Sequence, residues 1–320
     1  MSKVKIIFNK IFLEHDTGMH PENRKRLEAL GDLEETKIED GEKYLSLFHK
    51  KDYIKRVKIL AESGGGYLDP DTIISKRSYE AALYAVGATI MASKTNNFAL
   101  VRPPGHHAHP SRSSGFCVFN NISIAVQKLL EYHKKILILD FDSHLGDGTS
   151  RFFYKSNRVL YWSLHQFPAF PGNGTIEEIG EEEGKGYNIN IPLPPGTGDD
   201  VYMKALIKFL PIAKKFNPDI VAVSAGFDGH KDDLLLNLNL SMNIYYKIGE
   251  ILRKNFDNIF ATLEGGYNVK TFPSCLYNFI DGINNEKQKF KEKKTKTDIQ
   301  KKKRIKEKMN ELEEKISKFW

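Results

Sequence analysis

Short apolar runs rich in β-branched residues recur along the chain, and longer stretches of helical character lie between them. This alternation predicts repeated strand–helix units, which assemble into a parallel sheet covered by helices on both faces. The predicted strands are residues 4–8, 98–101, 136–139, 159–164, 187–191, 220–225 and 259–263. We therefore expect an α/β fold, a single domain with a mostly parallel central sheet and helices on both faces.

The stretches between these runs predict the helices and loops. Helices are expected over residues 44–60, 78–92, 121–132, 201–216 and 242–255. Another helix is expected to open at residues 20–24 and to reach about residue 30, with Pro21 in its first turn. Residues 64–66, three consecutive glycines, are expected to form a flexible loop.

Residues 136–149, ILILDFDSHLGDGT, organise the rest of the chain. The apolar run leads into Asp140, Asp142 and His144 at every second position, and alternate residues of an extended chain share a face. Burying these groups together costs free energy unless a cation or a catalytic role compensates. A Gly-Asp-Gly segment then ends the strand and adds the carboxylate of Asp147. Ligands in open α/β sheets bind at the carboxyl ends of strands, where this cluster is expected.

Three other predicted strands also end in polar loops marked by glycine. His106 and His107 follow one strand in a turn that two prolines and a glycine stiffen. Asp228 follows another strand, and Tyr267 follows a third. Each loop alone reads most simply as a solvated surface feature. Scattered surface residues do not predict four polar strand ends in one sheet, so we treat the four loops as one candidate site.

The residue types in this candidate site point to metal-assisted hydrolysis. Asp142, His144 and Asp228 offer two oxygens and one nitrogen. Such a set suits Zn²⁺ with an open position for water, or Fe²⁺ bound by two carboxylates and one histidine. Water activated at such an ion needs a base to take its proton, and His106 and His107 are the candidates.

The remaining polar residues fit supporting roles in the same chemistry. Asp140 and Asp147 are available to orient the two histidines through their far ring nitrogens. Attack on a carbonyl creates an oxyanion, which the Tyr267 hydroxyl can stabilise from the side opposite the metal. The two glycines before Tyr267 would let that side chain move. The residues therefore predict hydrolysis of an amide or an ester.

Six motifs, taken in order, resemble the histone deacetylase family. That family includes the acetylpolyamine amidohydrolases and the acetoin-utilisation proteins, and it shares its fold with arginase. The motifs are 102–108 (RPPGHHA), 114–117 (SGFC), 140–149 (DFDSHLGDGT), 163–165 (SLH), 225–228 (AGFD) and 264–268 (EGGYN). Any one motif would be weak evidence, whereas six in the right order are specific. The resemblance covers roughly residues 1–283.

The resemblance implies a role for each residue of the candidate site. The implied zinc ligands are Asp142, His144 and Asp228. His107 is implied as general base and acid, His106 as its electrostatic partner, and Tyr267 as the residue that polarises the substrate carbonyl. The carboxylates implied behind the two histidines are Asp140 and Asp147. The implied activity is removal of an acetyl or short acyl group from an amine, such as acetyl-lysine or an acetylpolyamine.

The resemblance also implies residues for substrate binding and for a second cation. A narrow acyl-lysine tunnel would be lined by Gly115, Phe116 and Phe170. A structural K⁺ site would be formed by Asp140, Ser163 and Leu164. Asp69 would bind the substrate backbone at the rim, and Arg26 would line an internal product channel.

The sequence departs from the family pattern at Leu145, where the family usually has a second histidine. That histidine is not a metal ligand, so the implied ligand set survives. The chain also lacks the long terminal regulatory regions of eukaryotic members. It is therefore identified as a prokaryotic-type member of the family.

The net charge of the chain is concentrated at its C-terminal end. Residues 286–320 hold 14 basic and 7 acidic residues, a net charge of +7 that equals the formal net charge of all 320 residues. We therefore expect two parts, a catalytic domain over residues 1–283 and a basic helical tail over residues 284–320. The apolar positions in the tail repeat as a heptad seam, and they are Ile305, Met309, Leu312, Ile316 and Phe319.

The tail is expected to be dispensable for chemistry, because it matches none of the catalytic motifs. It reads as a solvated charged helix or as a helix whose seam packs on something. That surface could be a second copy of the chain, the enzyme's own body, or an acidic partner such as nucleic acid. The remaining residues carry no net charge, so direct nucleic-acid binding is not expected of the main domain.

Composition and termini narrow the class of protein. The chain has 40% hydrophobic and 28% charged residues, as in ordinary globular proteins. It has no apolar run near the ~20 residues that span a bilayer, and its first residues do not have a signal-peptide layout. The two cysteines, Cys117 and Cys275, form no disulfide framework. We therefore expect a cytoplasmic protein without a membrane partner.

Two other readings belong to different classes. One is a non-catalytic protein that binds acylated ligands, or an oligomeric interaction protein, on the same fold. The presence of His106, His107 and Tyr267 argues against it. The other is an arginase-like ureohydrolase. That chemistry uses a carboxylate-rich two-manganese site, whereas the motifs here describe one metal, a histidine pair and a tyrosine.

Overall fold

The structure is a computed structural model that describes residues 3–320. Within these residues seven strands form one parallel sheet in the order β1-β4-β9-β8-β5-β6-β7, and β2 and β3 form a separate antiparallel hairpin. The strands are β1 (Ile6–Ile7), β2 (Gly65–Asp69), β3 (Thr72–Ser75), β4 (Phe98–Ala99), β5 (Ile136–Asp140), β6 (Val159–Gln166), β7 (Asn188–Leu193), β8 (Ile220–Ala225) and β9 (Ile259–Leu263).

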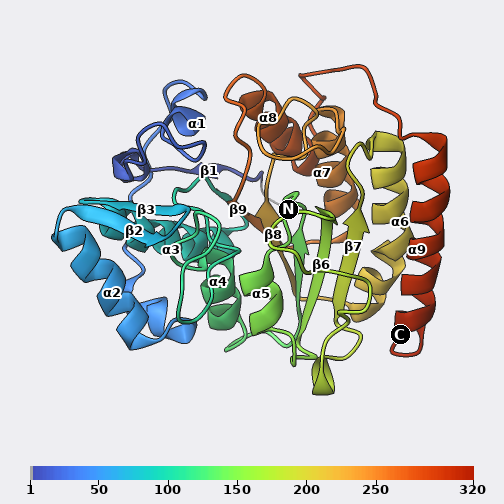
Figure 1. The fold of residues 1–320 in the computed structure, drawn as a ribbon, viewed down its shortest axis with the longest axis horizontal. Coiled ribbons are helices and arrows are strands. Elements are labelled where there is room, and N and C mark those ends of the chain that lie inside the picture. Colours follow the sequence, from blue (N-terminus) through green and yellow to red (C-terminus); the bar gives the residue numbers. More distant parts are fainter. Residues whose placement is uncertain (1–2) are drawn as a thin grey trace.

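Helices lie on both sides of this sheet, with α3 and α4 to its left in Figure 1, α6 and α9 to its right, and α7 above β6 and β7 in that view. The α-helices are α1 (Lys25–Glu28), α2 (Lys51–Glu62), α3 (Ser78–Thr95), α4 (Asn121–Leu129), α5 (Asp147–Phe152), α6 (Asp199–Phe216), α7 (Asn243–Asn255), α8 (Phe272–Ile283) and α9 (Ile299–Ser317). The 3₁₀ helices are η1 (Lys10–Glu14), η2 (Glu42–Leu47) and η3 (Glu182–Gly184).

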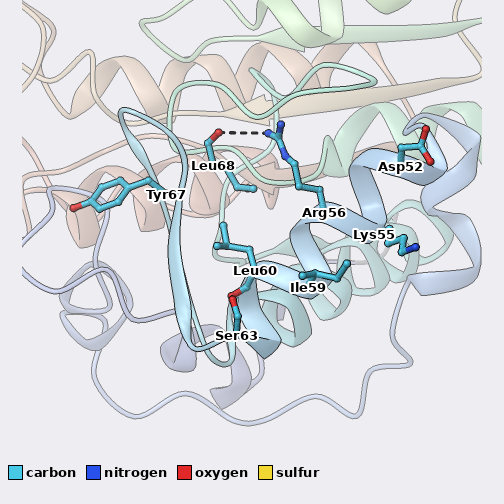
Figure 2. A pocket seen from close by; sticks show the side chains of 8 residues that line it. All are labelled: Asp52, Lys55, Arg56, Ile59, Leu60, Ser63, Tyr67 and Leu68. Atoms are coloured by element: carbon cyan, nitrogen blue, oxygen red, sulfur yellow. Dashed lines mark hydrogen bonds between the residues drawn. The ribbon is translucent and has the colours of Figure 1, made fainter.

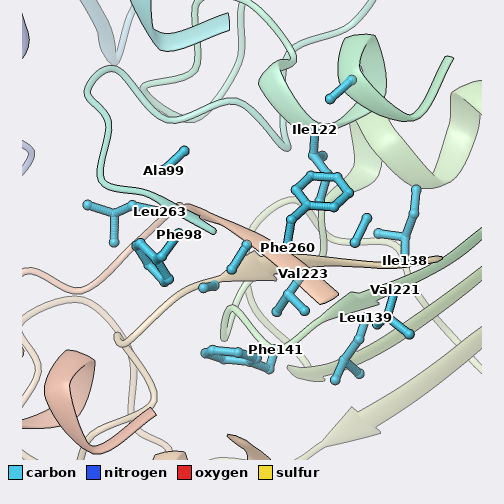
Figure 3. Close-up of a cluster of buried hydrophobic side chains, with 14 of the residues drawn as sticks. Phe98, Ala99, Ile122, Ile138, Leu139, Phe141, Val221, Val223, Phe260 and Leu263 are labelled. Atoms are coloured by element: carbon cyan, nitrogen blue, oxygen red, sulfur yellow. The ribbon is translucent and has the colours of Figure 1, made fainter. Parts of the chain in front are cut away.

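The central strand β5 explains why the sheet forms where it does. Its sequence, ILILD, is buried at every position between β6 and β8. A parallel strand covered by helices on both faces needs apolar side chains on both faces, which a continuous Ile/Leu run provides. Figure 3 shows Ile138 and Leu139 beside Val221 of the neighbouring strand β8, within one cluster of buried hydrophobic side chains.

The register of the sheet places its polar residues at one edge. Asp140, the last residue of β5, pairs with Ser163 of β6 and Ser224 of β8. Ala225, the last residue of β8, pairs with Leu263 of β9. The loops that leave β5, β8 and β9 therefore begin side by side at the carboxyl edge of the sheet, where the candidate site is expected.

The structure confirms the α/β fold and the parallel sheet, and it corrects several boundaries. The predicted helix over residues 44–60 is divided into η2 and α2, because His49 and Lys50 hydrogen-bond to other loops through Asn120 and Pro110. The helix predicted at residues 20–30 is reduced to α1, because Thr17 binds the Glu22 carbonyl and holds that segment as a turn.

The three glycines after α2 do not form a flexible loop. Gly65 and Gly66 begin β2, and both have positive φ angles, which glycine adopts without strain. The backbone carbonyl of Ile74 approaches Gly65 so closely that a Cβ atom there would overlap it. The glycines therefore permit a tight β2–β3 hairpin.

Two helices, α5 and α8, were not predicted from the apolar pattern.

The C-terminal segment is helical only in its second half. Residues 286–298 are mainly irregular, and Thr295 and Thr297 accept the backbone N–H groups of Asp199 and Gly198 at the start of α6. Helix α9 then lies alongside α6 (Figure 1). Four seam residues, Ile305, Met309, Leu312 and Ile316, are buried, and Phe319 is half-buried over Gly186.

The seam therefore packs on the body of its own chain. Trp320 completes this contact, because its ring lies against Tyr187 and Phe216 and its indole N–H donates to the Gly186 carbonyl at 2.9 Å. An ion pair between Lys302 and Asp200 at 2.6 Å joins the start of α9 to the start of α6. Within residues 3–320 no helix is long and apolar enough to cross a bilayer.

Candidate active site

The three predicted metal ligands come together at the carboxyl edge of the sheet. Asp142 and His144 follow β5, and Asp228 follows the adjacent strand β8. His144 Nδ1 lies 3.2 Å from Asp142 Oδ1 and 2.7 Å from Asp228 Oδ2, and all three residues are buried. Their ligand atoms lie within 4.8 Å of one another. The three residues thus form a compact cluster of three potential metal ligands.

The other oxygens of these carboxylates are held by the backbone. Asp142 Oδ2 accepts the N–H of Gly265 at 2.7 Å, and Asp228 Oδ1 accepts the N–H of Ser143 at 2.9 Å. Asp228 Oδ2 is buried, and its polar neighbour in the described chain is His144 Nδ1, at 2.7 Å. A Cβ atom at Gly226 would overlap the Asp142 carboxylate, so that position requires glycine.

The electrostatics of the cluster favour a cation. Burial and the neighbouring charge of Asp142 raise the pKa of Asp228 to about 7. Burial alone would lower the pKa of His144, but hydrogen bonds and charge from Asp142 and Asp228 raise it to about 10. Two buried carboxylates that repel each other are stabilised by positive charge between them. The donor set therefore fits a Zn²⁺ or Fe²⁺ ion.

The two predicted histidines lie beside this cluster, and each is hydrogen-bonded to the carboxylate predicted for it. His106 Nδ1 donates to Asp140 Oδ2 at 3.1 Å, and His107 Nδ1 donates to Asp147 Oδ1 at 2.8 Å. Their ring centroids are 4.1 Å apart, and the ring of His107 is 5.9 Å from that of His144. The free ring nitrogen of each histidine is therefore the Nε2 atom.

The pKa values of the two histidines shift in opposite directions. Burial would lower the pKa of His106, but the negative charges of Asp142, Asp140 and Glu264 raise it well above its ordinary value. Burial, followed by the positive charge of His106, lowers the pKa of His107 to about 4 against the opposing effect of Asp147. At neutral pH the pair is one imidazolium beside one neutral imidazole.

Two residues that support the histidines were not assigned from the sequence. Glu264 Oε2 accepts the backbone N–H groups of Gly105 at 2.7 Å and His106 at 3.1 Å, which fixes the histidine turn. Burial raises the pKa of Glu264 to about 7. His109 Nε2 binds the second oxygen of Asp147 at 2.8 Å. Glu264 lies within the EGGYN motif, but it contacts His106, about 160 residues away in the chain, and no local sequence pattern predicts that contact.

Tyr267 is buried next to the cluster, with 6% of its surface exposed. Its ring meets the ring of Phe116 edge-on at 5.8 Å, and the Arg26 guanidinium lies 5.0 Å from its centroid. Arg26 itself is fully buried and donates to the carbonyls of Gly266 at 2.7 Å and Glu264 at 2.6 Å. Arg26 therefore stabilises the backbone segment directly before Tyr267.

The three residues predicted to line a tunnel are close to the histidines. A Cβ atom at Gly115 would lie 2.6 Å from the His107 ring and 2.9 Å from the Phe170 ring, so a side chain there would fill the space between them. The ring of Phe170 is 5.0 Å from that of His107, and 47% of Phe170 is exposed. Phe116, with Phe170, gives the site aromatic walls.

The residues predicted to hold K⁺ lie on adjacent strands, with Asp140 paired to Ser163. Asp140 Oδ1 accepts the N–H of Asp142 at 3.2 Å, and Oδ2 also accepts the Tyr161 hydroxyl at 2.9 Å. Ser163 Oγ lies 2.9 Å from His165 Nδ1, and Leu164 is buried beside it. The K⁺ site remains a prediction.

Asp69 ends β2, and within residues 3–320 no hydrogen bond or ion pair connects its side chain to the histidine cluster. Its Oδ1 accepts the N–H of Asp71 at 2.9 Å, and its Oδ2 is buried without a partner in the described chain. Leu145, the departure from the family pattern, is buried and packs toward Gly174.

A surface hollow of about 570 Å³ lies between α2 and the hairpin strand β2 (Figure 2). Figure 2 shows the Arg56 guanidinium beside the Leu68 carbonyl, at 3.4 Å, with Leu60 and Ile59 along the helix. The residues that line it are Asp52, Lys55, Arg56, Ile59, Leu60, Ser63, Tyr67 and Leu68. This hollow contains none of the histidines or carboxylates of the candidate site.

The fold and the cluster together describe an α/β protein with a candidate catalytic site at the carboxyl edge of a parallel sheet. A histone deacetylase domain model matches residues 20–283 of the chain. A protein named "Probable deacetylase" from Archaeoglobus fulgidus is 38% identical over 293 residues, which cover 83% of this chain and 81% of that protein. A "Histone deacetylase-like amidohydrolase" from Pseudomonas aeruginosa is 34% identical, covering 80% of this chain and 73% of that protein.

Structural comparison agrees with these sequence matches. The crystal structure of the HDA15 HD domain has a TM-score of 0.88 with this chain, at 29% identity, and covers 98% of this chain and 95% of that one. The chain therefore belongs to the histone deacetylase family and is a hydrolase of the deacetylase class. The family and the enzyme class predicted from the sequence are confirmed.

Proposed function

We propose that this chain is a zinc-dependent amidohydrolase that removes an acetyl or another short acyl group from an amine. The proposed substrates are acetyl-lysine in a protein or peptide, or an acetylpolyamine. The observation that carries the proposal is the compact Asp142–His144–Asp228 cluster beside two histidines of opposite pKa shift. The names of the two relatives, a deacetylase and an amidohydrolase, support the same reaction class.

The proposed ligands of the ion are Asp142, His144 and Asp228, with Zn²⁺ preferred and Fe²⁺ as the alternative metal. When bound, such an ion supplies Lewis acidity that polarises the substrate carbonyl and lowers the pKa of water. The two carboxylates have their other oxygens fixed by backbone N–H groups, so the donors are oriented before the ion arrives.

His107 is the proposed general base. Its low pKa keeps it neutral at pH 7, and its bond to Asp147 holds the proton on Nδ1, which leaves Nε2 free to accept one from water. The same nitrogen can then deliver that proton to the leaving amine. His106, positively charged beside it, stabilises negative charge that develops at the reacting carbonyl.

Tyr267 is the proposed donor to the carbonyl oxygen. Burial raises the pKa of its hydroxyl well above its ordinary value, so the group remains a hydrogen-bond donor throughout the accessible pH range. Phe116 and Phe170 form apolar walls that would hold an extended acyl-amine chain and exclude water. The proposal also includes a structural K⁺ ion near Asp140, Ser163 and Leu164. Asp69 is proposed to contact the substrate.

A deacylation screen tests the proposed function. The zinc-loaded full chain is offered acetyl-lysine peptides, acetylputrescine, acetylspermidine and the corresponding butyryl compounds, with the His107→Ala variant and chelator-treated protein as controls. Turnover of at least one acyl amine that both controls lose is expected. Tight binding of these compounds by the zinc-loaded protein, without release of the acyl group from any of them, would show a binding protein instead.

A further inference from the structure

The loop between β8 and α7 contacts Tyr267 as well as carrying Asp228. Asp233 lies in this loop, five positions after the proposed ligand. Its Oδ2 atom accepts the backbone N–H groups of Tyr267 at 2.7 Å and Asn268 at 3.2 Å. Its Oδ1 atom accepts the N–H of Leu235 at 3.2 Å, which fixes the carboxylate in its own loop. One side chain therefore ties the proposed ligand loop to the backbone of the proposed carbonyl-binding tyrosine.

The backbone around Tyr267 needs such an anchor. Tyr267 follows Gly265 and Gly266, and Gly266 has a φ of +115°, a conformation that only glycine adopts readily. Two consecutive glycines give the chain many alternatives to the observed path. The paired N–H bonds to Asp233 select one of them. They thereby fix the position from which the Tyr267 side chain extends.

The opposite side of the loop is held by the C-terminal segment. Glu292 Oε2 accepts His230 Nε2 and the N–H of Met242, both at 3.0 Å, and its Oε1 atom pairs with Lys231. The backbone of Glu292 is held in turn by Asn243, whose amide donates to the Glu292 carbonyl at 2.7 Å. Glu292 thus joins the irregular segment before α9 to the loop that contains Asp233.

We propose that Asp233 is a positioning residue for Tyr267, and that Glu292 of the C-terminal segment holds the loop from which Asp233 acts. Neither residue touches the reacting atoms, and each acts through a named contact. The kinetic part of the proposal rests on the proposed function, because it requires Tyr267 to donate to the substrate carbonyl. It gives the C-terminal segment a part in chemistry, contrary to the expectation from sequence that the tail is dispensable.

Hydrogen exchange of the full-length chain tests the contact without reference to activity. Asp233→Ala should increase exchange at the amides of residues 267 and 268, because both lose their acceptor. Asp232→Ala is the matched control, since the Asp232 carboxylate is 54% exposed and accepts no backbone N–H in residues 3–320, although it lies near His230, at 3.9 Å, and near Glu292. Unchanged protection of residues 267 and 268 in Asp233→Ala would overturn the proposal whatever the enzyme does.

Kinetics of the same variants test the positioning role. Asp233→Ala should lower kcat by roughly tenfold or more with KM altered less than about twofold, because misplacement of Tyr267 weakens a contact made in the transition state. Asp233→Asn keeps one acceptor oxygen and should recover part of the loss. The zinc content of the Asp233 variants should equal that of the unmodified chain, which would show that the loss of kcat does not come from a displaced Asp228 ligand.

The decisive comparison uses the Tyr267→Phe background. There Asp233→Ala should lower kcat by less than about twofold, because the hydroxyl that Asp233 positions is already absent. An equal loss in both backgrounds would show that Asp233 acts by another route. If the unmodified chain hydrolyses no acyl amine, the proposed function fails, and the exchange result still decides the contact.

Glu292 is tested in the full chain with Glu286→Ala as its control, since Glu286 pairs only with exposed lysines of the described chain. Glu292→Ala should increase exchange in residues 230–235 and reduce kcat in the same direction as Asp233→Ala, by a smaller factor. Equal exchange of that loop in both glutamate variants would remove Glu292 from the proposal.

Discussion

His106 and His107 are neighbours in sequence with rings 4.1 Å apart, yet their surroundings favour opposite protonation states. His106 faces Asp140 and Asp142, and their charges outweigh burial and raise its pKa. His107 has one partner carboxylate, Asp147, and next to it the charge of His106, so burial dominates and its pKa falls to about 4. Environment alone therefore gives two identical side chains different protonation states.

The first prediction concerns the pH dependence of catalysis. His107 accepts a proton only when neutral, so kcat/KM should remain high down to about pH 5 and fall as the pH approaches 4. His106→Ala removes the neighbouring positive charge, which should raise the pKa of His107 and move the acidic limb to higher pH. The measurement is the pH profile of kcat/KM for both proteins. An acidic limb that does not move in His106→Ala would contradict the assignment.

The second prediction concerns the size of the His107 effect. His107→Ala should reduce kcat by about 10²–10⁴-fold, the usual contribution of a positioned general base. Although His107 is buried, KM and thermal stability should change little, because its ring packs against Phe170, which is 47% exposed, rather than in the hydrophobic core. His133→Ala, on an irregular surface segment, is the control. A loss of folding rather than of turnover would give His107 a structural role.

The third prediction concerns metal content. Asp228→Ala removes one of three donors and should reduce bound zinc to well below one ion per chain, with loss of activity. Asp219→Ala removes a carboxylate from the opposite end of the same strand and should leave the zinc content unchanged. Elemental analysis after dialysis is the measurement. Full zinc occupancy in Asp228→Ala would falsify the ligand assignment.

The fourth prediction concerns Tyr267. Tyr267→Phe keeps the ring between Phe116 and Arg26 but removes the hydroxyl, so folding should be preserved. Because the hydroxyl stabilises charge present only in the transition state, kcat should fall by about 10²–10³-fold with a nearly constant KM. Steady-state kinetics on the best substrate from the screen provide the test. A raised KM with unchanged kcat would assign Tyr267 to binding.

Local pattern was sufficient to predict the sheet and the residues at its edge. Most strands of the parallel sheet are short apolar runs, although β7 alternates asparagine with isoleucine. Asp142, His144 and Asp228 follow such strands within four residues. Strand β5 could be read from four consecutive apolar residues because burial on both faces demands them. The convergence of the site then follows from the rule that ligands bind at the carboxyl ends of parallel strands.

Contacts between distant segments could not be predicted in this way. Glu264 holds the turn before His106, and Asp233 holds the backbone of Tyr267, but neither contact has a spacing rule. The irregular segment before α9 illustrates the same limit. Its lysines and glutamates favour helix, yet tertiary bonds through Glu292 and Thr297 keep it irregular, because such bonds outweigh weak intrinsic propensity.

The fifth prediction separates two ways in which α9 can be packed. Leu312 is 1% exposed on the face toward the body of the chain, so Leu312→Ala should lower the free energy of unfolding by about 2–5 kcal/mol. Lys308→Ala, on the exposed face of the same helix, should change it by less than about 0.5 kcal/mol. Urea unfolding and solution mass are measured together. If the helix packs on its own chain, Leu312→Ala loses stability at constant mass and independently of protein concentration. A fall in mass, or a stability that depends on concentration, would mean that α9 packs on a second copy of the chain.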